Sequence, residues 1–288
     1  MSNNIDLVTI TCARDCGIQL LQSYSLDLMV TDFCNHYVVI EDNKLSMEEW
    51  YALLTPYYTR HRLHLISGSS LLSSEYYAND SQIKNGWHRS AVLKLLIADK
   101  IQSKKYLILD SKNFFVRQQS LNEWPLEDGN GIIEKYNSYG WIEVDEFCLK
   151  NNIAITENVY NSSTPFMVNT DIVKKIIEFD FLCLFFNKKR WWSSELFLYS
   201  IFTQHVGNKL KSKPVTNVTF WNTERRLNKK TLDDIYSWKN MRTFGLHRNI
   251  LKLGTDLTGF VDFLVGLGFK KSIVETGLTQ YKQDINEK

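Results

Sequence analysis

The segment from Trp87 to Phe115 constrains the fold of this chain more than any other. It opens with a helical pattern, passes through polar residues and reaches the apolar run Tyr106–Leu109, which Asp110 follows directly. The run is too short for a helix and has charged residues on both sides, so it predicts a buried strand. Ligands of open α/β sheets bind just beyond the carboxyl ends of the strands. Asp110 is therefore a candidate ligand or metal contact; the alternative is a strand-end carboxylate satisfied by its own turn.

Similar runs occur earlier in the chain and alternate with helical patterns. Apolar and β-branched runs at 7–11, 36–40 and 63–66 predict three further strands, separated by helices over 18–29 and 46–54, the second of which opens with a capping box. This alternation predicts an α/β fold with a mostly parallel central sheet flanked by helices. The chain has no G-x-G-x-x-G and no G-x-x-x-x-G-K-[ST], which argues against ordinary dinucleotide and P-loop sites.

The rest of the chain is less regular, and its polar end from Tyr281 onward is expected to fray. We expect loops and short helices over a site at 123–150. Further expected elements are a strand entered at 163–168, a helix over 171–179 capped by Thr170, a helix over 196–205 capped by Ser193 or Ser194, a strand over 214–221 and a strand or its exit at 244–248. Without repeats or linker-like composition, residues 1–288 are expected to form one domain.

Charge and cysteine content exclude several classes of protein. The 34 basic and 32 acidic residues leave a net charge of +2, which provides no electrostatic footprint for nucleic acid or an acidic membrane. The 5 cysteines form no C-x-x-C pair, so free thiols in a reducing compartment are expected. No signal peptide is evident at the N-terminus, and the most apolar run, near Phe181, is too short to cross a bilayer. We therefore expect a cytoplasmic protein without a transmembrane segment.

The order of these motifs resembles the nucleotide-sugar glycosyltransferases of the GT-A fold. More narrowly, it is similar to a domain-of-unknown-function family whose members are inferred to be glycosyltransferases. The matching stretches are, in order, LVTITCARD with LLQSYSLDLM, VVIEDN, GWHRSAVLKLLIADKI, KYLILDSKNFFVR, NSSTPFMVNTDIV, SSELFLYSIF and FGLHRN. The resemblance implies a single GT-A-like domain with a Rossmann-like nucleotide-sugar half over about 1–120, an acceptor half over about 121–270 and a polar tail at 280–288.

The resemblance also implies roles for individual residues. Asp110 matches the first aspartate of the D-x-D motif, and Glu195 matches an acidic residue at the head of a later helix. His247 matches a histidine that helps to bind the metal–diphosphate group. Thr11, Arg14, Asp42 and Lys94 would approach the nucleotide sugar, while Thr164 and Pro165 would line the sugar or acceptor side.

The D-x-D-like motif departs from the family pattern at its second acidic position, where the chain has Lys112. Mn²⁺ or Mg²⁺ prefers oxygen ligands, and an ammonium group cannot bind a metal ion. Lys112 could instead place a fixed positive charge beside the donor's diphosphate. Asp110 and His247 remain the candidate metal ligands. Two alternatives stay open: a transferase with little or no metal dependence, and a protein that binds its ligand without turnover.

Several candidate residues have a structural alternative. Glu195 is either a general base for an acceptor hydroxyl in an inverting enzyme, or a first-turn acid that interacts with the helix dipole. Trp192 either stacks on a sugar ring at the acceptor side or packs in the core. Lys94 could be a surface lysine, and His247 a solvent-facing loop residue. His88 at the head of its helix could meet phosphate or simply be solvated.

The sequence thus predicts a hexosyltransferase-like enzyme that transfers a sugar from a nucleoside-diphosphate donor to a saccharide-like hydroxyl, as in polysaccharide biosynthesis. Asp110 and Glu195 are its expected catalytic residues. The alternative is a non-catalytic saccharide- or nucleotide-binding protein on the same fold. A nucleotidyltransferase, the third hypothesis, would need more carboxylates around its metal ion.

Overall fold

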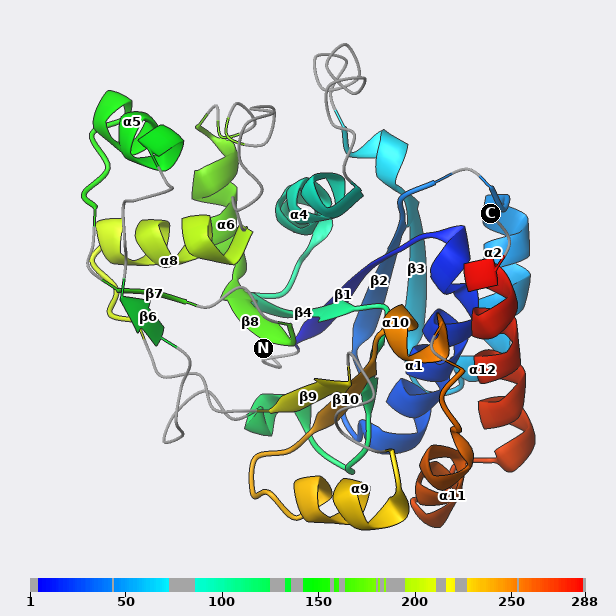
Figure 1. Cartoon of the computed structure of the whole chain (residues 1–288). Coiled ribbons are helices and arrows are strands. Elements are labelled where there is room, and N and C mark those ends of the chain that lie inside the picture. Colours follow the sequence, from blue (N-terminus) through cyan, green and yellow to red (C-terminus); the bar gives the residue numbers. More distant parts are fainter. Residues whose placement is uncertain are drawn as a thin grey trace.

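A five-stranded sheet forms the centre of the molecule (Figure 1). The computed structural model of the chain describes residues 5–42, 44–72, 86–124, 133–135, 142–155, 158–160, 164–179, 181, 184, 195–210, 216–220, 227–252 and 254–286. The strand order is β3-β2-β1-β4-β8. The strands are β1 (Asp6–Thr11), β2 (Asn35–Ile40), β3 (Arg62–Ser67), β4 (Lys105–Asp110) and β8 (Phe166–Asn169).

The predicted parallel sheet is confirmed. Strands β1 to β4 run parallel, and β8 joins the edge of β4 antiparallel. Thr11 pairs with Ile40, and Ile10 pairs with Asp110, so the carboxyl ends of three neighbouring strands lie level. This shared edge is where the α/β architecture places ligands.

Helices cover both faces of this sheet (Figure 1). Side chains alternate between the faces along each strand. Val8 and Ile108 pack with α4 (Gly86–Leu96), α6 (Thr170–Ile177) and α8 (Glu195–His205). Leu7 and Leu107 face the other way and pack with α1 (Cys16–Met29), α11 (Thr258–Gly266) and α12 (Lys271–Asn286). The core is therefore split into two layers by the sheet.

A second, smaller sheet lies in the layer with α1. Its order is β5-β10-β9, with β5 at Asn113–Phe115, β10 at Thr243–Leu246 and β9 at Asn217–Phe220. The remaining elements are α2 (Met47–Leu54), α5 (Ile142–Lys150), α9 (Lys229–Tyr236), α10 (Arg248–Lys252) and the β6–β7 pair (Ile133–Lys135 with Asn158–Tyr160). Among the described residues, every helix falls short of the length or apolar character needed to span a membrane.

The sequence predicted caps for α2 and α6, and the structure agrees with the first and differs from the second. The predicted capping box of α2 is confirmed, because Ser46 Oγ accepts from the backbone N–H of Glu49 and the Glu49 carboxylate accepts from that of Ser46. The predicted cap of α6 is wrong. Asn169, not Thr170, accepts from the first free N–H groups, while the Thr170 hydroxyl donates to the carbonyl of Ser103.

The predicted frayed tail is also wrong, because residues 280–286 belong to α12. Tyr281 and Ile285 are buried against the α1 layer. Asp284 accepts from Cys16 Sγ at 3.1 Å, which ties the last turns of the chain to the start of α1. Although most residues of this segment are polar, the buried residues Leu278, Tyr281 and Ile285 of α12 recur at helical spacing.

Helices α1 and α12 touch backbone to backbone at Gly17 and Gly277. A Cβ at Gly17 would lie 2.4 Å from the carbonyl oxygen of Gly277 and 2.5 Å from the backbone nitrogen of Tyr281. Neither neighbour is a flexible side chain, so the helices would have to move apart.

Gly17→Ala should therefore lower the free energy of unfolding by about 1–3 kcal/mol, the usual cost of overpacking. Gly266→Ala is the matched control: no atom lies within 4 Å of its added Cβ, and this exposed helical position should change stability by less than about 0.5 kcal/mol. Chemical denaturation of both variants measures the effect. Equal stability of the two would contradict the close contact between the helices.

Candidate functional site

A cavity of about 390 Å³ opens where β1, β2 and β4 end. It draws side chains from parts of the chain more than two hundred residues apart, from Ile10 to Tyr281. Its polar lining residues are Thr11, Cys12, Arg14, Asp15, Glu41, Ser90, Lys94, Asp110, Ser111, Lys112, Thr164, Glu195, His247, Arg248 and Tyr281. Most of the residues predicted from the sequence to form a site are therefore brought to one place.

An ion cluster lies on one wall of this cavity. Lys94 Nζ, from α4, donates to Asp110 Oδ1 at 3.1 Å and to Glu195 Oε1 at 3.0 Å. Lys112 Nζ donates to the other oxygen of Asp110, Oδ2, at 2.7 Å. The Lys94 and Glu195 side chains are only 8% and 3% exposed, so the alternative of a surface lysine is wrong.

Burial and charge act against each other in this cluster. Burial raises the pKa of Asp110, but the ammonium groups of Lys112 and Lys94 outweigh it, and a hydrogen bond with Thr164 adds to them, so that the pKa lies well below its ordinary value. Burial alone would lower the pKa of Lys94, yet the carboxylates of Asp110 and Glu195 raise it above its ordinary value. Asp110 therefore carries its charge across the physiological pH range, as does Lys94.

Two buried polar atoms of the cavity have no hydrogen-bond partner within the described part of the chain. They are Glu195 Oε2, at the first residue of α8, and Thr11 Oγ1, at the last residue of β1. Buried polar atoms are nearly always satisfied, by protein, water or ligand. Since both residues line the cavity, a polar ligand placed there would find one acceptor and one hydroxyl already desolvated.

Gln22 of α1 holds the loop that carries Lys112 through hydrogen bonds to its backbone. Both hydrogens of Gln22 Nε2 are used: the amide donates to the carbonyls of Asp110 at 2.7 Å and Asn113 at 2.6 Å. Asn113 Oδ1 accepts the backbone N–H of Asp110 at 2.9 Å. Gln22 is fully buried and is further fixed by the Thr9 hydroxyl. These bonds close the turn and fix the direction in which the Lys112 side chain leaves it.

Three cations that line the cavity act on a further buried carboxylate, Asp15. Arg14, Lys112 and Arg248 all act electrostatically on Asp15, which accepts from Ser111 Oγ at 2.8 Å. Burial raises the pKa of Asp15, and the Ser111 hydrogen bond and the three cations oppose that rise. Of this group, Arg14, Asp15 and Lys112 were expected near the donor from the resemblance, and Arg248 was not. Arg248 begins α10 directly after the predicted His247, and that adjacency was the one signal available for it.

His247 is half-buried at the cavity rim, so the alternative of a solvent-facing loop residue does not describe it. It lies between β10 and α10. Its backbone N–H donates to the carbonyl of Phe220 at 2.9 Å, and its Nδ1 accepts from the backbone N–H of Asn249 at 3.3 Å. The predicted strand or strand exit at 244–248 agrees with the end of β10 at Leu246.

Two further titratable groups near the turn after β1, Glu41 and Cys12, were not among the predicted site residues. Burial raises the pKa of Glu41 to about 7, and Asp42 and Asp15 add to the rise while Arg89 opposes it. Burial, together with Asp15, Glu41 and Asp42, raises the pKa of Cys12 to about 12, which keeps it a thiol. Free thiols were expected, and the described cysteines Cys12, Cys16, Cys34 and Cys148 are all unbridged.

Some predicted site residues do not line the cavity. The Asp42 carboxylate accepts from the backbone N–H of Ala13 at 3.2 Å and so holds the turn after β1. Pro165 is buried beside the lining residue Thr164. His88 is half-buried on α4. Trp192 lies outside the described residues, as do Ser193 and Ser194.

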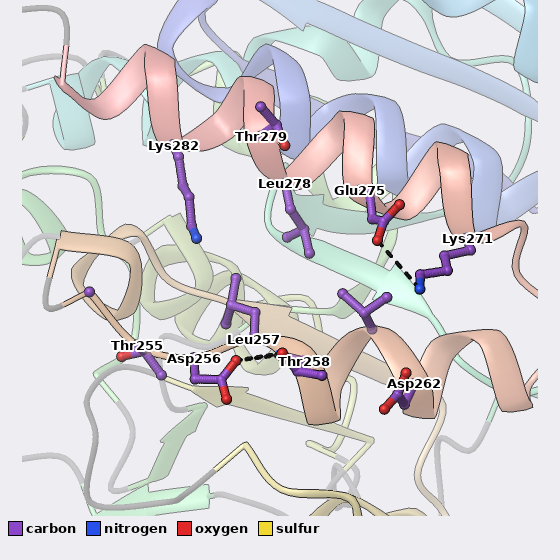
Figure 2. A pocket seen from close by; sticks show the side chains of 12 residues that line it. Thr255, Asp256, Leu257, Thr258, Asp262, Lys271, Glu275, Leu278, Thr279 and Lys282 are labelled. Carbon is purple, nitrogen blue, oxygen red and sulfur yellow. Dashed lines mark hydrogen bonds and ion pairs between the residues drawn. The ribbon is translucent and has the colours of Figure 1, made fainter.

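A second cavity, of about 400 Å³, lies between α11 and α12 (Figure 2). Two of its polar contacts are local: Lys271 pairs with Glu275 at 3.8 Å, and Asp256 accepts from the Thr258 hydroxyl at 2.7 Å. These are exposed contacts of neighbouring residues, which contribute little. Leu278 and Lys282 of α12 face this cavity, whereas Tyr281 faces the first. Only the first cavity combines buried charges with strand ends.

Within the described residues, no group of three or more histidine, cysteine, aspartate or glutamate side chains is arranged to hold a metal ion. The predicted ligands Asp110 and His247 line the same cavity but have other partners.

The comparisons with known proteins agree with the predicted fold. A family model described as a family of unknown function, DUF6492, matches residues 14–215. No curated protein matches the chain in sequence. The apo structure of the bifunctional glycosyltransferase WbbM is similar over 96% of this chain, at 15% identity and a TM-score of 0.50; the chain spans 52% of that protein. The galactosyltransferase LgtC, in complex with donor and acceptor sugar analogs, is similar over 96% of both chains, at 13% identity and a TM-score of 0.50. The predicted GT-A fold is thereby confirmed.

Proposed function

The chain belongs to the family of unknown function DUF6492, a name that assigns no activity, and we propose that it is a glycosyltransferase. It would transfer a sugar from a nucleoside-diphosphate donor to a hydroxyl group of a saccharide-like acceptor. One observation carries this proposal. On a GT-A fold, the cavity at the strand ends joins a cluster of cations to Glu195, a buried carboxylate with one oxygen that lacks a partner among the described residues.

The reaction needs two kinds of group, and the cavity has candidates for both. A base must take the proton of the acceptor hydroxyl while its oxygen attacks the anomeric carbon, and Glu195 Oε2 is desolvated and without a partner among the described residues. The bond from that carbon to the diphosphate oxygen breaks, and negative charge builds on the leaving nucleoside diphosphate. Arg14, Lys112, His247 and Arg248 line the cavity and would stabilise that charge.

Lys94 would act through its two carboxylate partners. Its ammonium donates to Asp110 and to Glu195 Oε1, which would leave Oε2 of Glu195 for the acceptor hydroxyl. Thr11 and Thr164 would contact the donor and the sugar. Trp192 and Pro165 at the acceptor side, Asp42 on the donor side, and the division into donor and acceptor halves stay predictions from the sequence.

A second candidate function rests on Lys112. Because this lysine stands where the family's motif has a carboxylate, and because both oxygens of Asp110 are engaged, the cavity could hold a nucleotide or saccharide without turnover. A pure binding protein and a transferase would share the same ligands and differ in catalysis alone.

Incubation with a panel of nucleoside-diphosphate sugars tests the proposal. We expect transfer or slow hydrolysis of at least one donor, together with a thermal shift by the corresponding nucleoside diphosphate, since a ligand that binds only the native state raises stability. A shift without hydrolysis or transfer would favour the binding protein. The absence of any shift and any turnover would refute both.

The finer assignments are part of the same proposal. A hexosyl donor, a role in polysaccharide biosynthesis and a cytoplasmic location are expectations that the sequence raised. Product analysis by mass spectrometry, with the donor found in the panel, would identify the sugar transferred.

A further inference from the structure

The carboxylate of Asp110, the residue expected to bind a metal ion, is already neutralised. Lys94 Nζ lies 3.1 Å from Oδ1 and Lys112 Nζ lies 2.7 Å from Oδ2, so each oxygen has its own ammonium partner. A divalent ion at Asp110 would stand next to two fixed positive charges. Mg²⁺ and Mn²⁺ bind through oxygen ligands, and both oxygens of Asp110 already accept from ammonium groups.

The other acidic groups that line the cavity are Glu41, Asp15 and Glu195, and the last two already have partners. Glu195 Oε1 accepts from Lys94, and Asp15 Oδ2 accepts from Ser111. His247 Nδ1, on the predicted second ligand, accepts from a backbone N–H. The described residues contain no group of three suitable side chains around one point. The residues present therefore do not fit a divalent ion at this site.

The position of Lys112 is fixed before any ligand arrives. Gln22 of α1 donates to the carbonyls of Asp110 and Asn113, on either side of Lys112. The carbonyl of Lys112 accepts the backbone N–H of Leu246 at 3.2 Å. The Lys112 side chain is 21% exposed, which leaves its head accessible from the cavity. A charge held in place this way needs little reorganisation when negative charge develops beside it.

Arg14 and Arg248 line the same cavity as Lys112. All three act on the Asp15 carboxylate, although they come from the turn after β1, from the loop after β4 and from the start of α10. Three cations from separate elements around one point form an anion site for a group with two or more negative charges.

We propose, resting on the glycosyltransferase function above, that the ammonium of Lys112 takes the place of the divalent cation. The donor's diphosphate would bind to Lys112, Arg14 and Arg248, and neither its binding nor sugar transfer would require a metal ion. The leaving nucleoside diphosphate would be stabilised by these fixed charges alone.

Calorimetric titration of UDP and GDP into the wild-type protein tests this, with excess EDTA in one series and excess Mn²⁺ in the other. We expect the same dissociation constant in both series.

Lys112→Met should weaken binding about 10- to 100-fold in both series, the loss expected for a hydrogen bond to a charged group. Lys112→Asp restores the D-x-D spacing and should bind only in the Mn²⁺ series. Lys100→Asp, at an exposed position, is the matched control and should bind as the wild type does.

The outcomes separate this proposal from the function on which it rests. Wild-type binding that disappears in EDTA and returns with Mn²⁺ would overturn the substitution of metal by lysine and leave the glycosyltransferase proposal intact. A Lys112→Met variant with wild-type affinity would also overturn it. Failure of both nucleotides and all donor sugars to bind in either series would refute the two proposals together.

Discussion

Glu195→Gln should lower the turnover number for sugar transfer by about 10²–10⁴-fold, the contribution of a positioned general base. The amide keeps nearly the shape of the carboxylate and its oxygen can still accept from Lys94 Nζ, so the cluster keeps its packing. It cannot take a proton from the acceptor hydroxyl. The dissociation constant of the nucleoside diphosphate should stay close to that of the wild type, because the role proposed for Glu195 is toward the acceptor and not the donor.

Steady-state kinetics with the donor identified in the panel, together with nucleotide titration, measure this effect. Glu178→Gln is the matched control, since Glu178 is an exposed acid just after α6 and should keep full turnover. A fall in nucleotide affinity equal to the fall in turnover would mean that Glu195 holds the site together and is not the base. Unchanged turnover would exclude it from the chemistry.

Lys94→Met should lower the free energy of unfolding by about 3–5 kcal/mol, the usual loss when one partner of a buried ion pair is removed. Methionine is similar in length to lysine and is apolar, so packing is largely kept. What is lost is the counter-charge: Asp110 would keep its ion pair with Lys112, while Glu195 would lose its ion pair with Lys94. Typical domains have only about 5–15 kcal/mol of stability in total, so the loss would be a large fraction of it.

Urea denaturation of Lys94→Met and of the exposed control Lys100→Met separates the buried ion pair from a general loss of lysine. The control should change by less than about 0.5 kcal/mol. Adding Glu195→Gln to Lys94→Met should recover part of the lost stability, because the uncompensated carboxylate is then gone. A double variant whose loss equals the sum of the two single losses would show that the pair is not coupled.

The strands of the central sheet could be predicted because each buried parallel strand is a short apolar run closed by polar residues. The antiparallel direction of β8 could not, since a strand's direction depends on the path of the chain around it. Helix α12 was missed because its polar residues outnumber the buried ones, and its burial depends on a close approach to α1 that only Gly17 and Gly277 permit.

The candidate site was predictable to the extent that it lies at strand ends. Asp110 stood out there, and Lys94, Glu195 and His247 came from the resemblance to GT-A glycosyltransferases. The Lys94–Glu195 contact joins residues 101 positions apart, and no local pattern reports it. The roles of Gln22, Ser111 and Arg248 are set by hydrogen bonds and by charges brought together in space, which sequence spacing does not record.

Helix α1 joins two parts of the molecule that would otherwise be separate. Gly17 contacts α12, which brings Tyr281 to the cavity, and Gln22, little more than one turn further along, closes the loop that carries Lys112. This has a consequence for mutational scans. A substitution at the contact between α1 and α12 can shift α1 and so change the position of Asp110, although the substituted residue does not line the cavity. Inactive variants at this contact would therefore indicate a displaced α1 helix. They would not be evidence of a second functional surface between α1 and α12.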